Sequence, residues 1–265
     1  MSKIQNIHNF FPVGIRAGYT NRKVGNSHGP FAKFNLGIKC GDDDKLVLDS
    51  RALLEKEINK KIIWLNQCHS SHFVDLNSYK NYDEIKADGS FTTEKNIACS
   101  ILTADCLPIL VSTGNGEVIG AIHAGWRGLS KNIIFKFFDA FLKKVKLFNA
   151  ETLNCKTLSL LIWLGPCIGK KNYEVGPEVR QVFINKSKIL EEFFFQTSEH
   201  KWLMDIKQLA NEMIINVLDS KKIKQYSIVS DKRCTYECSE DFYSVRKNTT
   251  TGRMATLIWK ENIST

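Results

Sequence analysis

Three apolar segments with very short connections lie in the middle of this 265-residue chain, at residues 97–102, 107–112 and 117–124. Each has the length and composition of a buried strand. The connection between the second and third segments contains Gly-Asn-Gly at positions 114–116, a composition typical of a tight hairpin turn. The pattern therefore predicts a β-hairpin at the centre of the fold, around which the other elements have to pack.

Helical periodicity occurs on both sides of this hairpin. Residues 43–60 and 205–218 carry apolar side chains on one face and charges on the other, and a third helix is predicted to begin with Ser130 as its N-cap. Further strands are predicted at residues 62–65, 158–164, 226–230 and 254–259, and a long ordered loop at residues 21–43. This mixture indicates an α+β fold rather than a doubly wound parallel sheet. No repeat or linker divides the sequence, so we expect a single domain over residues 1–265.

The composition is that of a globular protein, with 43% hydrophobic and 25% charged residues. The net charge of +9 makes nucleic-acid binding a candidate function. However, only eight of the 37 basic residues are Arg, the side chain that reads guanine and stacks on bases. We therefore expect a Lys-rich solvated surface that binds no nucleic acid but attracts an anionic small substrate.

The N-terminal 14 residues contain neither the apolar stretch nor the small-residue cleavage site of a secretory signal. The longest apolar run, at residues 158–164, is far too short to span a bilayer. We therefore expect a cytoplasmic protein without membrane contact. In that compartment the eight Cys residues remain reduced and are available for metal binding or catalysis.

The hairpin register brings one Cys and one His together. If the loop consists of residues 114–115, Thr113 pairs with Gly116, and counting back along both strands places Cys106 directly opposite His123. Opposed side chains share one face with Cβ atoms ~5 Å apart, a separation that suits one zinc ion. A different loop would shift this register. Taken singly, Cys106 also fits a small buried thiol and His123 a hydrogen-bonded histidine at a strand end, so both alternatives stay open.

A third ligand has to come from another part of the chain. His69 and His72 both follow the predicted strand at residues 62–65. Residues 65, 67 and 69 alternate on one face, so His69 continues the strand pattern and His72 does not. The residues alone therefore favour His69 as the third ligand beside Cys106 and His123, while the metal site and the metal-free alternatives both stay open.

Several strings of the sequence resemble the laccase-domain family, an older name of which is multicopper polyphenol oxidase. The likeness extends over nearly the whole chain, and its strings occur in the family's order. They are Phe34-Asn35-Leu36-Gly37, Gln67-Cys68-His69, Thr103-Ala104-Asp105-Cys106-Leu107-Pro108, His123-Ala124-Gly125-Trp126-Arg127-Gly128, Trp163-Leu164-Gly165-Pro166, Tyr173-Glu174-Val175-Gly176, Cys234-Thr235-Tyr236 and Thr251-Gly252-Arg253-Met254-Ala255.

The resemblance implies a layered α/β/β/α sandwich with mixed sheets and zinc ligands at His69, Cys106 and His123. It also implies purine nucleosides and phosphate as substrates, with phosphorolysis of adenosine, inosine and S-methyl-5′-thioadenosine and deamination of adenosine. Copper is the expected substitute metal. The chain departs from the family pattern at three positions near the pocket: Lys39 replaces a common His, Cys68 a common Val, and Ser70 a common Gly.

Three protein ligands leave a fourth zinc position open, and zinc lowers the pKa of a bound water to ~7. Arg127, just before the predicted helix start at Ser130, is expected to bind phosphate. Asp105 is a candidate for orienting a substrate or a ligand. Arg22 and Asn35 match the family's glycine-rich loop and are weaker candidates for substrate binding.

Other functions remain as alternatives. One is a hydrolase that edits a peptidoglycan precursor, and another uses the Cys106 thiolate as a nucleophile with His123 as base and no metal. The polyphenol oxidase label fits poorly, because a multicopper centre needs many imidazole ligands and the chain has six His. Cys234 and Cys238 have no further ligand near them in sequence and are expected to be simple thiols.

Overall fold

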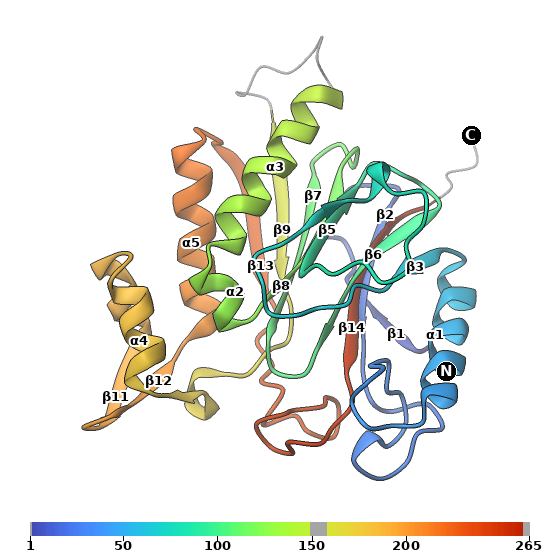
Figure 1. The fold of residues 1–265 in the computed structure, drawn as a ribbon. Coiled ribbons are helices and arrows are strands. Elements are labelled where there is room, and N and C mark those ends of the chain that lie inside the picture. Colours follow the sequence, from blue (N-terminus) through green and yellow to red (C-terminus); the bar gives the residue numbers. More distant parts are fainter. Residues whose placement is uncertain (1, 149–157, 262–265) are drawn as a thin grey trace.

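The computed structural model describes residues 2–148 and 158–261. Two β-sheets pack face to face, and helices cover both outer faces (Figure 1). This arrangement confirms the predicted α+β class and the α/β/β/α layering.

The first sheet has five strands and is mixed. Its order is β1 (Ile4–Asn6), β2 (Ile15–Thr20), β14 (Met254–Lys260), β6 (Ile97–Thr103) and β3 (Lys61–Ile63). Only the β3–β6 pair is parallel among these strands. Helix α1 (Asp44–Ile58) covers the outer face, where Leu54 and Ile58 pack against Leu257. Asp43 caps the helix by accepting a hydrogen bond from the Lys45 amide.

The second sheet has six strands. Its order is β13 (Gln225–Ser230), β9 (Ser159–Leu164), β7 (Leu107–Thr113), β8 (Ile119–Ala124), β5 (Gly89–Thr92) and β4 (Val74–Asp75). Helices α3 (Ile133–Phe148) and α5 (Ile206–Ser220) cover its outer face (Figure 1). The core beneath α3 is rich in aromatic rings, with Phe137, Phe138 and Phe141 fully buried.

A smaller unit is formed by the segment between β9 and β13. It contains the three-stranded sheet β10 (Glu174–Val175), β12 (Lys201–Met204) and β11 (Phe194–Ser198), together with helix α4 (Pro177–Ile184). Short 3-10 helices occur at η1 (Gly29–Phe31), η2 (Leu76–Ser78), η3 (Lys170–Asn172) and η4 (Lys188–Phe193). The sequence did not predict this small sheet.

The space between the two large sheets is the inner core. Ile101 and Ile258 of the five-stranded sheet belong to the same buried cluster as Leu110 and Ile119 of the six-stranded sheet. Strands β6, β7 and β8 are therefore covered on both faces, which explains why their sequences are apolar runs rather than alternating patterns. In the part of the chain that the structure describes, no helix is long and apolar enough to cross a membrane.

The predicted hairpin exists, but its register is wrong by two residues. The loop is longer than expected, because the Thr113 amide bonds the Val118 carbonyl at 3.0 Å and His123 lies opposite Pro108. A two-residue shift keeps each side chain on its own face, since the period of a strand is two. Cys106 precedes β7 and lies diagonally across from His123 instead of directly opposite. The two side chains therefore still face the same side.

Two further predictions of local structure are wrong. Ser130 does not cap a helix but ends the short helix α2 (Trp126–Ser130), which Asn132, with φ of 65°, separates from α3. Arg127 consequently lies within α2 rather than before a helix. His69 does not continue a strand either, since β3 ends at Ile63 and His69 has a left-handed φ of 55° in a turn.

Candidate metal centre

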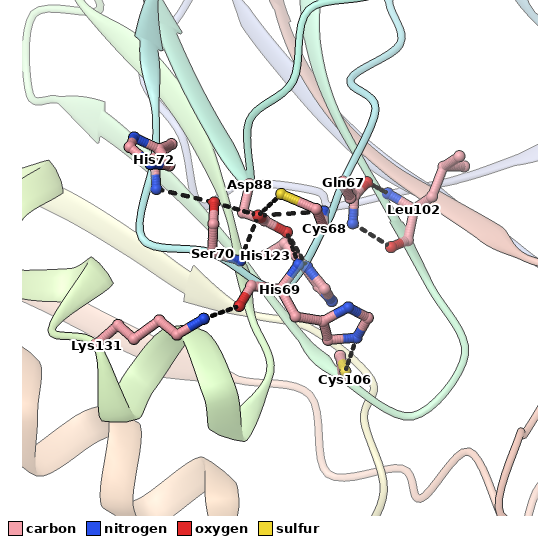
Figure 2. A network of polar contacts seen from close by, with 10 residues as sticks. All are labelled: Gln67, Cys68, His69, Ser70, His72, Asp88, Leu102, Cys106, His123 and Lys131. Carbon is pink, nitrogen blue, oxygen red and sulfur yellow. Dashed lines mark hydrogen bonds and ion pairs between the residues drawn. The ribbon is translucent and has the colours of Figure 1, made fainter.

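His69, Cys106 and His123 meet at one point, although they come from three separate segments. Their donor atoms all lie within 4.8 Å of one another. The Cys106 Sγ is 3.9 Å from the His69 Nε2, and the two imidazole rings meet edge to face with centroids 4.8 Å apart. Figure 2 shows the His69 ring directed at the Cys106 thiol. The three residues that the sequence selected thus form one potential chelating group.

Asp88 organises this group and was missed by the sequence analysis. One carboxylate oxygen lies 2.8 Å from Nδ1 of His123 and accepts the His69 amide at 3.0 Å. The other accepts the amide and the hydroxyl of Ser70, each at 2.7 Å, and the amide of Cys68 at 3.3 Å. Figure 2 shows Asp88 at the centre of these contacts. One fully buried carboxylate therefore holds the turn that presents His69 and also fixes the His123 ring.

No sequence signal distinguishes Asp88 from an ordinary turn residue. It precedes Gly89 at the start of β5, where an acidic residue and a glycine are common. Only the folded chain brings it beside His123. Two departures from the family pattern, Cys68 and Ser70, lie in the turn that it binds, and the Ser70 hydroxyl adds a hydrogen bond to the carboxylate.

The ionisation of these groups is coupled. Burial disfavours the Cys106 thiolate, but the charge and hydrogen bond of His123 outweigh burial and lower the pKa of Cys106. Burial alone would lower the pKa of His123, but the Cys106 thiolate and Asp88 raise it. Burial also opposes ionisation of Asp88, yet hydrogen bonds from His123 and Ser70 hold its pKa well below the usual range. Without a metal the centre therefore favours a thiolate–imidazolium pair.

The donor set fits a zinc ion. Tetrahedral ligands with zinc bonds of 2.0–2.3 Å are about 3.5 Å apart, so the present spacing needs only small side-chain movements. Because Asp88 occupies Nδ1 of His123, the other ring nitrogen remains for a metal, as in carboxylate–histidine–zinc arrangements. One thiolate and two imidazoles suit zinc or copper. Within residues 2–148 and 158–261 this is the one group with such metal-binding geometry, and Cys234 and Cys238 form no second one.

Asp105 lies beside Cys106 and lines the cleft. It has a strained φ of 94°, and one carboxylate oxygen accepts the Thr235 hydroxyl at 2.6 Å. The other accepts the Ser244 hydroxyl at 2.9 Å and the Arg246 amide at 2.7 Å. Both oxygens are thus engaged in holding the C-terminal loop against the turn that carries Cys106. Asp105 therefore fixes the wall of the site, and its expected role in orienting a substrate or a ligand stays a prediction.

The three potential ligands lie on the wall of a cleft of about 780 Å³. Trp126 and Arg127 line it beside the histidines, with the Arg127 guanidinium 4.6 Å above the Trp126 ring. Four arginines line this cleft, and none of them has a carboxylate within 4.0 Å among the residues described; they are Arg51, Arg127, Arg246 and Arg253. With Lys39 these arginines outnumber the two acidic lining residues, Glu84 and Asp105, so the cleft suits an anionic ligand.

The structure does not bring Arg22 and Asn35 to this cleft. Arg22 bonds the Ser239 carbonyl at 3.4 Å and lies over the Tyr243 ring. Asn35 is fully buried, and its side-chain oxygen accepts the Arg253 amide at 2.8 Å. Neither residue lines the cleft, and the expectation that they contact substrate stays a prediction.

Comparison with known proteins supports the resemblance. The family model of the multi-copper polyphenol oxidoreductase laccase matches residues 16–261. The chain is 36% identical over 253 residues to the purine nucleoside phosphorylase YfiH of Shigella flexneri, covering 94% of this chain and 95% of that protein. A purine nucleoside phosphorylase of Haemophilus influenzae is 34% identical over 258 residues, covering 94% and 96%.

Solved structures share the fold. A Neisseria meningitidis protein superposes with a TM-score of 0.85 at 26% identity, covering 98% of this chain and 100% of the other. The mixed sheets and the helix layers described above are therefore a known architecture.

Proposed function

The chain belongs to the multi-copper polyphenol oxidoreductase laccase family, and from that premise we propose that it is a zinc-dependent purine nucleoside phosphorylase. Its substrates are adenosine, inosine and S-methyl-5′-thioadenosine, each cleaved with inorganic phosphate. Support comes from relatives at 30% to 36% identity that carry the name purine nucleoside phosphorylase. The proposal treats residues 1–265 as one catalytic domain that acts in the cytoplasm, where the Cys106 thiol stays reduced.

One observation carries the proposal. A triad of metal-binding side chains and an arginine without a carboxylate partner line the same cleft. His69, Cys106 and His123 suit a metal, and Arg127 suits a phosphate anion. A site with only one of these features would fit many enzymes, whereas the two together fit a reaction between a nucleoside and phosphate.

The residues of the chain have separate tasks in phosphorolysis. His69, Cys106 and His123 would hold a zinc ion, which would act as a Lewis acid and lower the pKa of a bound water. Asp88 holds the His123 ring with Nδ1 engaged, so that the metal-facing nitrogen keeps its lone pair. Arg127 binds phosphate and directs an oxygen to C1′ of the ribose, because its guanidinium has no competing carboxylate. The new C1′–oxygen bond forms, the C1′–N9 bond breaks, and the purine leaves with a proton.

Deamination of adenosine is a second activity of the same site. It consumes water and releases ammonia, so it requires the metal triad but no phosphate. The three potential ligands line the cleft and would leave the fourth coordination position of a zinc ion open to a water molecule. This arrangement supports deamination as a second activity.

Three alternative functions require different properties of the protein. A polyphenol oxidase requires several copper ions, but the described residues offer one potential metal group. A metal-free thiolate enzyme would use the Cys106–His123 pair, and its activity would not change when a chelator is added. A hydrolase of peptidoglycan precursors would cleave an amide and act on no nucleoside.

A nucleoside screen with and without phosphate tests the proposal. We expect inosine from adenosine in both conditions, and ribose 1-phosphate and adenine only with phosphate. His123→Ala should abolish both reactions, while the control His200→Ala, at an exposed histidine, should retain them. Absence of nucleoside cleavage by metal-loaded wild-type protein would contradict the proposal and make the precursor hydrolase the leading alternative.

A further inference from the structure

Three basic residues and a tryptophan line the same cleft on the side of the five-stranded sheet. We call these four residues the Arg51 subsite; they are Lys39, Arg51, Trp64 and Arg253. Lys39 lies in the loop before α1, Arg51 on α1, Trp64 directly after β3, and Arg253 directly before β14. The proposed phosphorolysis uses none of these side chains.

Two arginines of this subsite are held beside one stretch of backbone. Nε of Arg51 donates a hydrogen bond of 2.9 Å to the Leu36 carbonyl. The side chain of Arg253 covers the next residue so closely that a Cβ at Gly37 would lie 2.6 Å from its Cγ. The Arg51 guanidinium and the aliphatic stem of Arg253 therefore lie beside the backbone of residues 36–37, and both side chains are held by backbone contacts rather than by acidic partners.

The charges of the Arg51 subsite have no anionic partner. Among the described residues, the Arg253 guanidinium donates only to the carbonyls of Thr251 and Gly252, through Nη1. The terminal nitrogens of Arg51 have no hydrogen-bond acceptor among the described residues, and its guanidinium lies 4.4 Å above the Trp64 ring. Asp44 and Glu55 are the nearest acidic groups on α1, but neither lies within ion-pair distance of Arg51.

Arg51 is also partly removed from water. Burial lowers its pKa to about 10. A guanidinium that has lost water and gained no anion binds an added anion more strongly than a fully hydrated one. Its planar fork fits the oxygens of a phosphoryl group, and the Trp64 ring restricts the plane of the fork.

We propose that the Arg51 subsite is a second anion site, which binds the phosphoryl group of a nucleoside 5′-phosphate. The inference rests on the proposed function for the purine nucleoside half of the ligand. Arg127 near the metal triad and the Arg51 subsite line one continuous cleft, so two anions can be bound at once. The cleft lies within the size range of sites for ligands of nucleotide size. Inorganic phosphate presents the same chemistry, and the experiment separates the two sources.

Calorimetric titration without turnover tests this assignment. Inosine, inosine 5′-monophosphate and inorganic phosphate are titrated separately into zinc-loaded protein, so that neither deamination nor phosphorolysis occurs. The variants are Arg51→Gln, Arg253→Gln and Arg51→Lys, with Arg16→Gln as the control. Arg16 is half-exposed outside the cleft and pairs with Glu261, so its replacement changes the net charge equally. Thermal melts identify variants that fail to fold, and Arg253→Gln tests the subsite if Arg51→Gln unfolds.

We expect the monophosphate to bind at least about tenfold more tightly than inosine, as two charge-assisted contacts allow. Arg51→Gln and Arg253→Gln should each weaken the monophosphate by about tenfold and leave inosine nearly unchanged, while Arg51→Lys should lose less. Equal affinities of inosine and its monophosphate for the wild-type protein would overturn the assignment. A loss confined to inorganic phosphate would also overturn it and would show that the subsite holds the co-substrate. Because nothing reacts, failure of the proposed phosphorolysis would leave these affinities measurable.

Discussion

At the scale of single residues, Asp88 connects the three parts of the candidate metal centre. It bonds His123 directly and holds the turn that carries His69. The sequence predicted the three potential ligands because Cys and His are scarce and chemically distinctive. It could not predict Asp88, since acidic residues are frequent and this one is 35 positions from His123 in sequence. Similarly, nothing in the sequence showed that Asp105 uses both oxygens within the protein.

Asp88→Asn is predicted to weaken zinc binding by about 10–100-fold, the usual effect of losing a carboxylate behind a metal-binding histidine. The amide cannot accept all the hydrogen bonds that both carboxylate oxygens accept. Zinc affinity is measured by competition with a chromogenic chelator. Asp83→Asn, at an exposed position of a nearby loop, is the matched control. An unchanged zinc affinity in a folded Asp88→Asn protein would exclude the positioning role.

Arg127→Ala is predicted to raise the KM for phosphate by about tenfold and to spare deamination, because only phosphorolysis needs a bound anion. Steady-state kinetics of both reactions on the same preparation measure this difference. The Arg127 side chain lies over the Trp126 ring and makes no hydrogen bond or ion pair with the described residues, so its loss should not unfold the protein. If both reactions decline equally, Arg127 binds the nucleoside or supports α2 instead.

At the scale of elements, the sequence predicted helices and strands better than their connections. Helices α1 and α5 and the strands with long apolar patterns lie near the expected positions, because such patterns are determined by burial. The sequence did not predict four further strands of the large sheets, which are β1, β2, β4 and β5. The predictions of the hairpin register and of a helix start at Ser130 were wrong, because both features depend on turn geometry. His123 nevertheless lies on the same face as Cys106, because a shift of two residues leaves each side chain on its own face of the strand.

Helix α3 provides an element-scale test. Phe141 is fully buried against the six-stranded sheet, and its ring lies near those of Phe91 and Phe137. Phe141→Ala is predicted to lower the free energy of unfolding by about 3–5 kcal/mol, the range for removing a buried aromatic ring. Phe135→Ala, which replaces a half-exposed ring of the same helix, should cost much less. Urea unfolding of zinc-loaded protein measures both, and equal losses would contradict the described packing.

At the scale of the whole molecule, the charge distribution separates a small-molecule enzyme from a nucleic-acid-binding protein. The net charge is +9, and four of the five arginines that have no carboxylate partner among the described residues line one cleft, Arg22 being the exception. Only the total charge and the scarcity of Arg could be predicted from the sequence. Which arginines lie together is decided by long-range packing, because Arg51, Arg127, Arg246 and Arg253 come from distant segments.

We therefore predict no sequence-selective nucleic-acid binding at physiological salt. Fluorescence anisotropy with labelled duplex DNA and single-stranded RNA should show at most the weak, salt-sensitive binding of a basic surface, with Kd no tighter than about 10⁻⁶ M. A tight complex that distinguishes between sequences would instead assign the basic cleft to nucleic acid.

The central claim is that this chain cleaves purine nucleosides with phosphate through a zinc centre formed by His69, Cys106 and His123. Its most direct test is the initial rate of phosphate-dependent inosine cleavage by metal-stripped protein, measured against added zinc. The account predicts negligible activity at the start and a plateau near about one zinc ion per chain. A stripped protein that retains its full rate with Cys106 intact would contradict the claim and favour a metal-free thiolate mechanism.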